Sequence, residues 1–488
     1  MTTLTGETFE SVDPATGAVV GTHPVHTADQ VEAAVAAARD AADWWASLGF
    51  AGRAERLARW RAALARRMPE LCRVITAETG KPAGDAQLEL VLAIEHLAWA
   101  AKHARKELGP QRRAPGMLLA NQVASVEYHP LGVVGVIGPW NYPVYTPLGS
   151  ISYALAAGNA VVFKPSEYTP GVGRWLADAF AEAVPEHPVL QLVTGFGATG
   201  AALTTAGVDK IAFTGSAATG KKVMASAAET LTPVVIEAGG KDPLLVDADA
   251  DLEAAADATV WGAFSNAGQT CAGVERVYVH ERVYDAFVDK VVDKARKVEA
   301  GEHYGPMTMP SQVDVVRKHI DDALARGGRA LVGGNGAVGE RFVRPTVLVD
   351  VPEDCSAVRE ETFGPTVTIA KVADMDEAIE KANDSPYGLG STVFSKSRGM
   401  ELARRLRTGQ TAINAPLSFA GIASLPFGGS GESGFGRIHG PEGLREFARP
   451  KSIARQRFTA PIALTSFARS KRTEAIVGKL IAKLHGKR

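Results

Sequence analysis

The stretch KIAFTGSAATGKKV, residues 210–223, has the pattern of one βα unit. Its first part, KIAFTG, is a short apolar run that predicts a buried strand, and Gly215 and Gly220 flank the turn that follows. Backbone N–H groups at the start of the next helix are free to hold a phosphate, with help from Ser216 and Lys221. The stretch therefore predicts a strand end that binds an anion, although a plain glycine-rich βα turn has the same pattern.

Similar apolar runs recur along the chain and alternate with helical stretches. The first set is LGVVGVIG (131–138), AVVFKP (160–165), VLQLVTG (189–195), TPVVIEAGG (232–240) and PLLVD (243–247), and the second is VYVH (277–280), TVLVD (346–350) and STVFS (391–395). This alternation is typical of crossover connections on a parallel sheet. Before it, residues 28–48 have helical spacing, and the helical pattern continues to about residue 108 with a break at GKPAGDA. VASVEYHP (123–130) alternates like a hairpin strand.

Composition limits the class of protein. The chain has 488 residues, of which 46% are hydrophobic, enough for a large core in two or three lobes. Its 53 basic and 54 acidic residues nearly cancel, so no overall field favours a nucleic acid or a membrane. The cysteines at 72, 271 and 355 form no CxxC, which argues against a disulfide framework and a metal site. Without a visible secretory signal or a spanning run, we expect a cytoplasmic protein with free thiols and no bound metal.

A literal G-x-G-x-x-G, GFGATG, occurs at residues 195–200 after the run VLQLV. This pattern alone predicts a dinucleotide fold. Such a fold also needs an acidic residue about 20 positions later to hold a ribose, whereas residues 217–222 are Ala, Ala, Thr, Gly, Lys and Lys. Chance matches are common in a chain with 50 glycines, so we do not assign a cofactor to this motif.

Several segments together carry a resemblance to a known family. They are DPATGAVVGTHP (13–24), GPWNYP (138–143), AAGNAVVFKPSE (156–167), FTGS (213–216), EAGGKDP (237–243), FSNAGQTCAG (264–273), REETFGP (359–365) and LPFGGSGESGFGR (425–437). In this order they resemble the NAD(P)-dependent aldehyde dehydrogenase superfamily over residues 10–458. The resemblance implies an α/β fold with a Rossmann-like cofactor domain, an α/β catalytic domain and a small bridging β element.

The resemblance identifies candidate catalytic residues. Cys271 resembles the nucleophile, whose thiolate adds to an aldehyde carbonyl to form a thiohemiacetal, and its small neighbours leave room for the substrate. Asn141 resembles the donor that, with the Cys271 backbone N–H, stabilises the negative oxygen of the tetrahedral intermediate. After hydride leaves for the cofactor, Glu237 resembles the general base that activates water to hydrolyse the thioester. Outside these motifs, such an asparagine more often marks a turn, and such a glutamate a solvated or capping position.

The resemblance also implies a cofactor site. Its residues are Trp140, Lys164, Ser166, Glu167, Gly195, Gly215, Ser216, Gly220, Glu361 and Phe363. In the family, the FKPSE segment holds the adenosine ribose, the FTGS turn receives the pyrophosphate at a helix N-terminus, and the EETFGP segment holds the nicotinamide ribose and ring. The carboxylate of Glu167 should repel a 2′-phosphate, so NAD is favoured and NADP is less favoured.

The implied reaction is NAD-dependent oxidation of an aldehyde to a carboxylic acid. Gly149 stands where many relatives have a bulky aromatic residue, and Ser265 where semialdehyde enzymes often have arginine. These differences predict a roomy, apolar tunnel for medium-chain aliphatic or aromatic aldehydes. Ser150 and Ile438 replace a lysine and a glutamate that aid proton movement in relatives, which leaves the proton route open.

Other functions stay open at this point. A semialdehyde dehydrogenase, for example one for succinic semialdehyde, differs only in the substrate. A CoA-acylating dehydrogenase usually lacks the glutamate found here at Glu237, and a non-catalytic scaffold usually loses the nucleophile or the cofactor contacts. A cysteine hydrolase without cofactor would cleave esters equally well in the absence of NAD.

The resemblance also divides the chain. It places the cofactor-binding domain at 1–111 and 131–239, the catalytic domain at 240–447 and an oligomerisation β element at 112–130 and 448–460. Strands in that element would otherwise expose unpaired edges, so we expect a homodimer or homotetramer and no nucleic acid partner. The tail, 461–488, is basic and has an apolar helical stripe. We expect this stripe to pack on the enzyme body or a neighbouring subunit, in preference to a peripheral contact with an anionic membrane.

Overall fold

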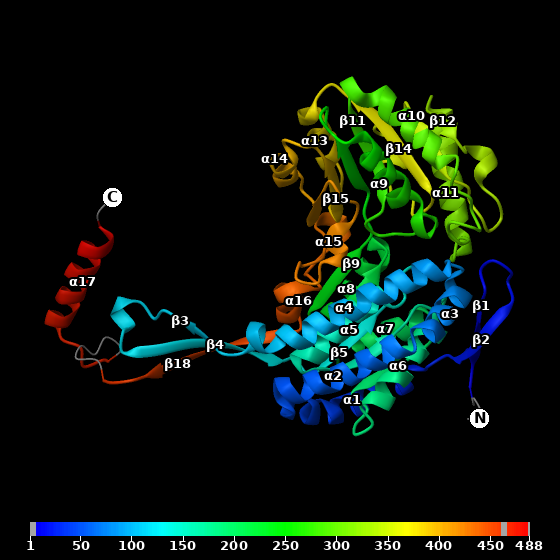
Figure 1. The fold of residues 1–488 in the computed structure, drawn as a ribbon. Helices are drawn as coiled ribbons and strands as arrows, with labels where there is room; N and C mark the ends of the chain where they lie inside the picture. The colour runs from blue at the N-terminus through cyan, green and yellow to red at the C-terminus, as the bar shows by residue number, and fades with distance from the viewer. Residues whose placement is uncertain (1–5, 460–465, 487–488) are drawn as a thin grey trace. The chain divides into compact units, whose positions relative to one another are not determined.

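The structure, a computed structural model, describes residues 6–459 and 466–486 of the chain (Figure 1). The chain divides into two compact units. The larger unit is Met1–Leu108 with Pro130–Arg449, and the smaller unit is Gly109–His129 with Pro450–Arg488. The larger unit contains two mostly parallel sheets covered by helices, which is the α/β class expected from the sequence.

The first sheet of the larger unit has six strands in the order β17-β9-β8-β5-β6-β7. Its strands are β5 (Val133–Ile137), β6 (Ala160–Lys164), β7 (Leu190–Leu192), β8 (Lys210–Gly215), β9 (Val234–Ala238) and β17 (Gly434–Phe435). All neighbours are parallel except β17, which runs antiparallel to β9. Strands β5 to β9 are the apolar runs predicted from the sequence. They are rich in Val and Ile and are largely buried because helices cover the sheet.

The connections of this sheet are helices, as expected for parallel strands. They are α5 (Tyr145–Ala157), α6 (Pro170–Ala183), α7 (Gly197–Thr205) and α8 (Ala217–Ala228). The N-terminal part adds β1 (Thr8–Val12), β2 (Val19–Pro24), α1 (Ala28–Ser47), α2 (Gly49–Arg66), α3 (Met68–Thr79) and α4 (Ala83–Leu108). The predicted break lies at Gly80, whose φ of +71° is left-handed and therefore favours glycine.

The second sheet has seven strands in the order β12-β13-β14-β11-β10-β15-β16. They are β10 (Asp242–Val246), β11 (Val274–His280), β12 (Arg329–Val332), β13 (Thr346–Val349), β14 (Thr366–Val372), β15 (Gly390–Phe394) and β16 (Gln410–Ile413). Only β12 is antiparallel to its neighbour. The longer helices here are α9 (Leu252–Phe264), α10 (Tyr284–Ala295), α11 (Pro310–Ala325), α13 (Met375–Asn383) and α14 (Gly399–Arg405), and the shorter ones are α12 (Ser356–Arg359), α15 (Ser418–Gly421) and α16 (Gly440–Glu446).

The smaller unit is built on a three-stranded sheet in the order β18-β4-β3. Its strands are β3 (Gln111–Arg113), β4 (Gln122–Pro130) and β18 (Ala448–Gln456), and β3 is antiparallel to β4. After it comes α17 (Lys471–His485), whose first turn is capped by the Ser470 hydroxyl. No side chain of α17 is buried. In the described parts of the chain, no helix is both long and apolar enough to cross a membrane.

Candidate active site

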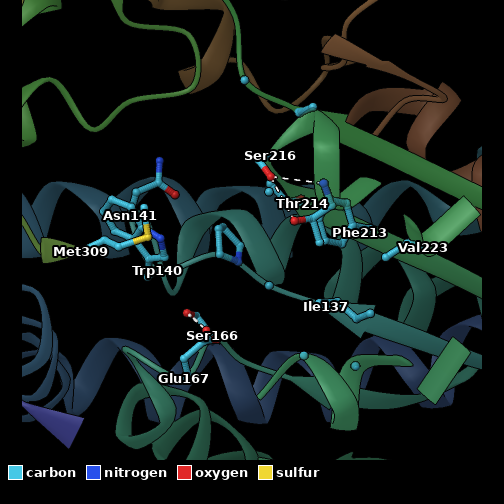
Figure 2. Close-up of a pocket in the computed structure, with 18 of the residues that line it drawn as sticks. Ile137, Trp140, Asn141, Ser166, Glu167, Phe213, Thr214, Ser216, Val223 and Met309 are labelled. Carbon is cyan, nitrogen blue, oxygen red and sulfur yellow. Dashed lines mark hydrogen bonds between the residues drawn. The ribbon is translucent and has the colours of Figure 1, made fainter. Parts of the chain in front are cut away.

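The candidate site lies at the carboxyl ends of β5, β6, β8 and β9, the edge at which parallel α/β sheets bind ligands. A cavity of about 790 Å³ opens there. Predicted residues on its wall are Trp140, Asn141, Lys164, Ser166, Glu167, Gly215, Ser216, Cys271, Glu361 and Phe363. Figure 2 shows Trp140 and Asn141 on one side of the cavity, with Ser166 and Glu167 on another. Residues far apart in the chain thus meet in one place.

The Cys271 loop has an unusual backbone. It follows α9 through three consecutive residues with positive φ: Asn266 (52°), Ala267 (56°) and Gly268 (70°). A Cβ at Gly268 would collide with the carbonyl of Gly364, so only glycine allows this close approach. The small residues noted in the sequence therefore serve the turn and its packing against the REETFGP segment.

The thiol of Cys271 is partly exposed on the cavity wall. Burial raises its pKa well above the usual value, and the charge of Glu237 raises it further. At neutral pH the thiol is therefore protonated, and forming the nucleophilic thiolate requires a proton acceptor.

Glu237 is near the end of β9 and is 3% exposed. Neither carboxyl oxygen has a hydrogen-bond partner among the described residues. Burial raises its pKa from 4.5 to about 7, because the ionised form loses its hydration. A solvated or capping glutamate would show neither feature, whereas a general base at neutral pH needs both an available oxygen and this pKa.

Asn141 follows the end of β5 and is 6% exposed. Its Nδ2 donates to the carbonyl of Gln269 at 2.9 Å, which leaves its second N–H available. Its own backbone carbonyl accepts from Lys81 Nζ at 2.8 Å and from Asn266 Nδ2 at 3.1 Å. These bonds join the asparagine loop to the cysteine loop and hold its side chain at the cavity wall.

The FKPSE segment forms another part of the wall. Lys164, at the end of β6, is 4% exposed and donates from Nζ to the Pro165 carbonyl at 3.1 Å. The Ser166 hydroxyl donates to Glu167 Oε2 at 3.4 Å, as drawn in Figure 2. The segment thus presents one ammonium and one carboxylate group to the cavity, a pair that suits ribose hydroxyl groups.

The turn after β8 forms the opposite wall. Ser216 is the N-cap of α8, and its hydroxyl accepts the N–H of Thr219 at 3.3 Å. The first N–H groups of this helix have no partner within it and favour an anion. Lys222 lines the cavity, whereas Lys221, which the sequence suggested, pairs with Glu432 at 2.6 Å.

Glu361 and Phe363 stand next to the candidate catalytic residues. Glu361 Oε1 is buried without a hydrogen-bond partner among the described residues. Burial raises the pKa of this carboxyl to about 8. Its oxygen lies so close to Gly239 that a Cβ there would collide with it. The Phe363 ring meets Trp140 edge-on, with ring centres 5.5 Å apart.

Two predicted glycines do not line the cavity. Gly220 packs inside α8, where a Cβ would be 3.1 Å from Ile236, and Gly195 turns the chain with a φ of +144° just before α7. Conversely, Gly197 and Gly200 of the GFGATG motif line the wall. The motif therefore reaches the cavity through these two glycines, and it supplies no acidic ribose ligand, as the sequence indicated.

Sequence reasoning missed several other residues of the wall. They include Ile137, Phe213, Thr219, Ser226, Met309, Gln312 and Val315. The last three come from the N-terminus of α11 and the residue before it, in the half of the chain that forms the second sheet. No local motif marks them, since tertiary packing alone brings α11 to the cavity.

On the other side of Cys271 lies an apolar cluster. Its members are Ala272, Leu389, Ala412, Phe419, Phe427 and Ile438, with Cys271, Leu417 and Ala420 packed against it. The room expected at Gly149 is filled, because a Cβ there would be 2.6 Å from His439 Nε2 and 3.3 Å from Ile438. Ser265 is half-buried, and its hydroxyl oxygen is buried without a hydrogen-bond partner among the described residues. Apolar side chains thus pack beside Cys271, and Gly149 adds no room there.

The cavity fits a dinucleotide. Its donor set combines a helix N-terminus for a pyrophosphate, an ammonium and a carboxylate for a ribose, and the orphaned Glu361 oxygen for further hydroxyl groups. A Cβ at Gly197 would meet nothing within 4 Å, so this part of the wall faces open space. Lys164, Glu167 and Ser216 would hold one half of such a molecule, and Glu361 with Phe363 the other.

Comparisons with known proteins show the family to which the chain is similar. The model of the aldehyde dehydrogenase family matches residues 2–453. A Methylomonas protein named 4,4'-diapolycopene aldehyde oxidase is 38% identical over 466 residues, covering 93% of this chain and 87% of the relative. A Mycobacterium tuberculosis protein named putative succinate-semialdehyde dehydrogenase [NADP(+)] 2 is 38% identical over 453 residues, covering 91% of this chain and 87% of the relative. The structure of an NAD-dependent aldehyde dehydrogenase from Sinorhizobium meliloti has a TM-score of 0.89 and is 34% identical in sequence. The match covers 94% of this chain and 93% of that protein.

Proposed function

Because the chain belongs to the aldehyde dehydrogenase family, we propose that it oxidises an apolar aldehyde to a carboxylic acid with NAD as the electron acceptor. The observation that carries this proposal is the juxtaposition of a cavity-wall thiol, Cys271, with a buried, unpartnered carboxyl group, Glu237. The same cavity wall presents the residues suited to a dinucleotide.

The roles of the two groups follow from their pKa shifts. With its pKa near 7, the Glu237 carboxylate takes a proton at neutral pH and so favours the thiolate of Cys271. The thiolate sulfur forms a bond to the aldehyde carbon, and the remaining Asn141 N–H stabilises the resulting oxyanion. When bound, a nicotinamide ring would supply the acceptor for the hydride, which is the hydrogen of the former aldehyde C–H bond with its electron pair, and the oxyanion becomes the carbonyl of a thioester. Glu237 then releases the thiol proton to solvent and removes a proton from water, whose oxygen bonds to the thioester carbon; the C–S bond breaks and the sulfur leaves as the Cys271 thiolate.

The cofactor is NAD or NADP in the relatives, and the chain's own residues favour NAD. The M. tuberculosis relative is named for NADP(+), and the S. meliloti structure for NAD. In this chain Glu167 lines the cavity beside Lys164. A carboxylate at a ribose site repels the charge of a 2′-phosphate, although Lys164 reduces that repulsion. We therefore assign NAD as the preferred cofactor and NADP as the weaker one.

The substrate that we propose is a medium-chain aliphatic or aromatic aldehyde. The side chains that pack with Cys271 in the apolar cluster include Ala272, Phe419 and Phe427. A carboxylate placed against such side chains loses hydration, which costs several kcal/mol, so they favour an apolar aldehyde over succinic semialdehyde. The relative named for diapolycopene aldehyde is consistent with an apolar substrate, whereas the M. tuberculosis name supports the semialdehyde as the second candidate.

Glu237 also argues against CoA acylation, since a base that activates water favours hydrolysis of the thioester. An intact nucleophile and cofactor cavity argue likewise against a scaffold function. We further propose that the enzyme acts in a reducing cytoplasm, which keeps Cys271 free, and that it assembles as a homodimer or homotetramer through the smaller unit.

One panel of aldehydes tests the proposed function. NADH absorbance is followed with n-alkanals of increasing length, benzaldehyde and succinic semialdehyde, each with NAD and with NADP. We expect the highest kcat/KM for the apolar aldehydes with NAD. An optimum for the semialdehyde would contradict the substrate assignment, and ester hydrolysis without any NADH formation would contradict the reaction itself.

A further inference from the structure

A buried ion pair outside the residues assigned so far lies behind the active site. Lys241 and Glu275 are 1% and 5% exposed, and Lys241 Nζ donates to Glu275 Oε2. A buried pair of this kind is costly to desolvate and contributes little net stability. Its position, therefore, is more informative than its energy.

The pair is joined to the REETFGP segment by direct hydrogen bonds. Lys241 Nζ donates to Thr362 Oγ1 at 3.0 Å. The Glu275 carboxylate accepts the backbone N–H of Thr362 at 2.9 Å and that of Phe363 at 3.1 Å. Phe363 has a φ of +50°, an unfavourable backbone conformation for a residue with a side chain. The bonds to Glu275 hold the segment in that conformation.

Lys241, Glu275 and Thr362 each stand close in sequence to a candidate catalytic or cofactor-facing residue. Lys241 is four residues after Glu237, and Glu275 is four residues after Cys271. Thr362 stands between Glu361 and Phe363. One buried cluster therefore ties together the segments that carry the base, the nucleophile and the cofactor-facing pair.

Further bonds stiffen this cluster. Gln312 Nε2 donates to the Thr362 carbonyl at 2.7 Å, and the Thr362 hydroxyl is 3.0 Å from His319 Nδ1. Arg276 Nε donates to the Lys241 carbonyl at 2.8 Å, across the start of neighbouring strands β10 and β11. The polar groups of Thr362 thus have four partner residues from three different segments, since Gln312 and His319 both belong to α11, and its loop has little freedom to shift.

We propose that Lys241 and Glu275 are positioning residues that set the distance between the Cys271 sulfur, the Glu237 carboxylate and the Glu361–Phe363 segment. The inference rests on the proposed function, because it gives these three groups their roles. Without Glu275, the backbone N–H groups of Thr362 and Phe363 lose their acceptor. The segment at 361–363 then moves relative to the Cys271 thiol. A misplacement of 1 Å at a reacting centre lowers a rate by about a hundredfold.

The test compares three variants with the wild type. Glu275→Gln keeps the size of the side chain and one acceptor oxygen but removes the charge, and Thr362→Val removes only the hydroxyl group that bonds Lys241. Lys241→Met combined with Glu275→Gln leaves no unpaired buried charge, which protects the fold. The matched control is Lys210→Met with Glu446→Gln, a half-buried pair 2.5 Å apart at the other end of β8 from the cavity.

Several readouts separate positioning from mere stability. We expect the Glu275 variants to lower kcat roughly ten- to a hundredfold. They should also raise KM for NAD, enlarge the isotope effect with an aldehyde deuterated at the carbonyl carbon, and speed amide hydrogen exchange at Thr362 and Phe363. Alkylation of Cys271 by iodoacetamide without cofactor should also slow in these variants, because the thiolate depends on the distance between the thiol and Glu237. The control pair should lower only the melting temperature.

Two results would overturn the inference. One is a Glu275→Gln enzyme that melts earlier but keeps the wild-type kcat, KM, isotope effect and exchange rates. The other is wild-type kinetics in the Lys241→Met, Glu275→Gln enzyme, which would show that any well-packed pair suffices. A wild type that forms no NADH would refute the proposed function instead, and amide exchange at Thr362 and Phe363 would still decide whether the pair holds the segment.

Discussion

Replacing Glu237 with glutamine tests the base and its burial in one variant. Glutamine has nearly the same shape, so Glu237→Gln removes the charge and leaves the packing at the end of β9. General base catalysis contributes about 10²–10⁴-fold to a rate, and we expect turnover to fall by that factor. Hydride transfer precedes thioester hydrolysis, so a first burst of NADH should remain, although it forms more slowly because Glu237 also favours the Cys271 thiolate, and later turnover should be slower still.

The same substitution has a calculable effect on stability. The wild-type carboxyl has a pKa of about 7 in the folded chain against 4.5 as a free group, because burial disfavours its ionised form. The folded state therefore keeps a proton that the unfolded state releases, and stability falls as pH rises from 4.5 to 7. Each unit of pKa difference corresponds to about 1.4 kcal/mol, so the full cost is about 3 kcal/mol above pH 7. Glutamine cannot ionise and avoids this cost.

Two assays check these expectations. Stopped-flow absorbance gives the NADH burst and the steady rate, and urea unfolding at pH 5 and pH 8 gives the free energy of unfolding. The variant should become more stable relative to the wild type by about 3 kcal/mol between these pH values. Wild-type turnover should rise with pH through about 7, and that rise should be absent from the variant. Turnover at the wild-type rate, or a stability difference that does not change with pH, would refute the assignment of Glu237.

Other perturbations test the remaining assignments. Cys271→Ala should abolish NADH formation while NAD binding, followed by calorimetry, persists; residual NADH formation would exclude the thiol as nucleophile. Glu167→Ser should narrow the preference for NAD in kcat/KM, and a wild type that prefers NADP would contradict the role of that carboxylate. Gly149→Ala should destabilise the fold by about 1–3 kcal/mol in chemical unfolding, since its Cβ would press on the His439 ring, and His439→Ala in the same chain should relieve the loss. No side chain of α17 is buried within the chain, so we expect its apolar residues to pack on a neighbouring subunit. Deleting 466–488 should then weaken the oligomer, seen as a lower sedimentation coefficient, or lower the melting temperature. Binding of the intact protein to anionic vesicles would count against that packing role.

Local sequence was sufficient for the architecture of the larger unit. Runs of Val and Ile bounded by glycine predicted strands such as β5 and β8, and apolar periodicity predicted α1 and the break at Gly80. These features depend on neighbouring residues, since backbone conformation and solvent exposure of a strand or helix repeat along a few residues. The motifs around Asn141, Glu237 and Cys271 likewise identified the family, because each motif is contiguous in the chain.

Only the tertiary structure decided properties that depend on residues far apart. The pKa of Glu237 depends on the groups that bury it, and the room beside Gly149 depends on His439, which the chain brings back much later. The packing of α8 decided which of its faces meets the cavity, so that Lys222 lines the cavity and Lys221 pairs with Glu432. The Lys241–Glu275 pair has no sequence signal, because either residue alone resembles an ordinary surface charge. Burial and long-range contact arise from packing of the whole chain, and a local pattern contains no information about which distant side chain will fill a given space.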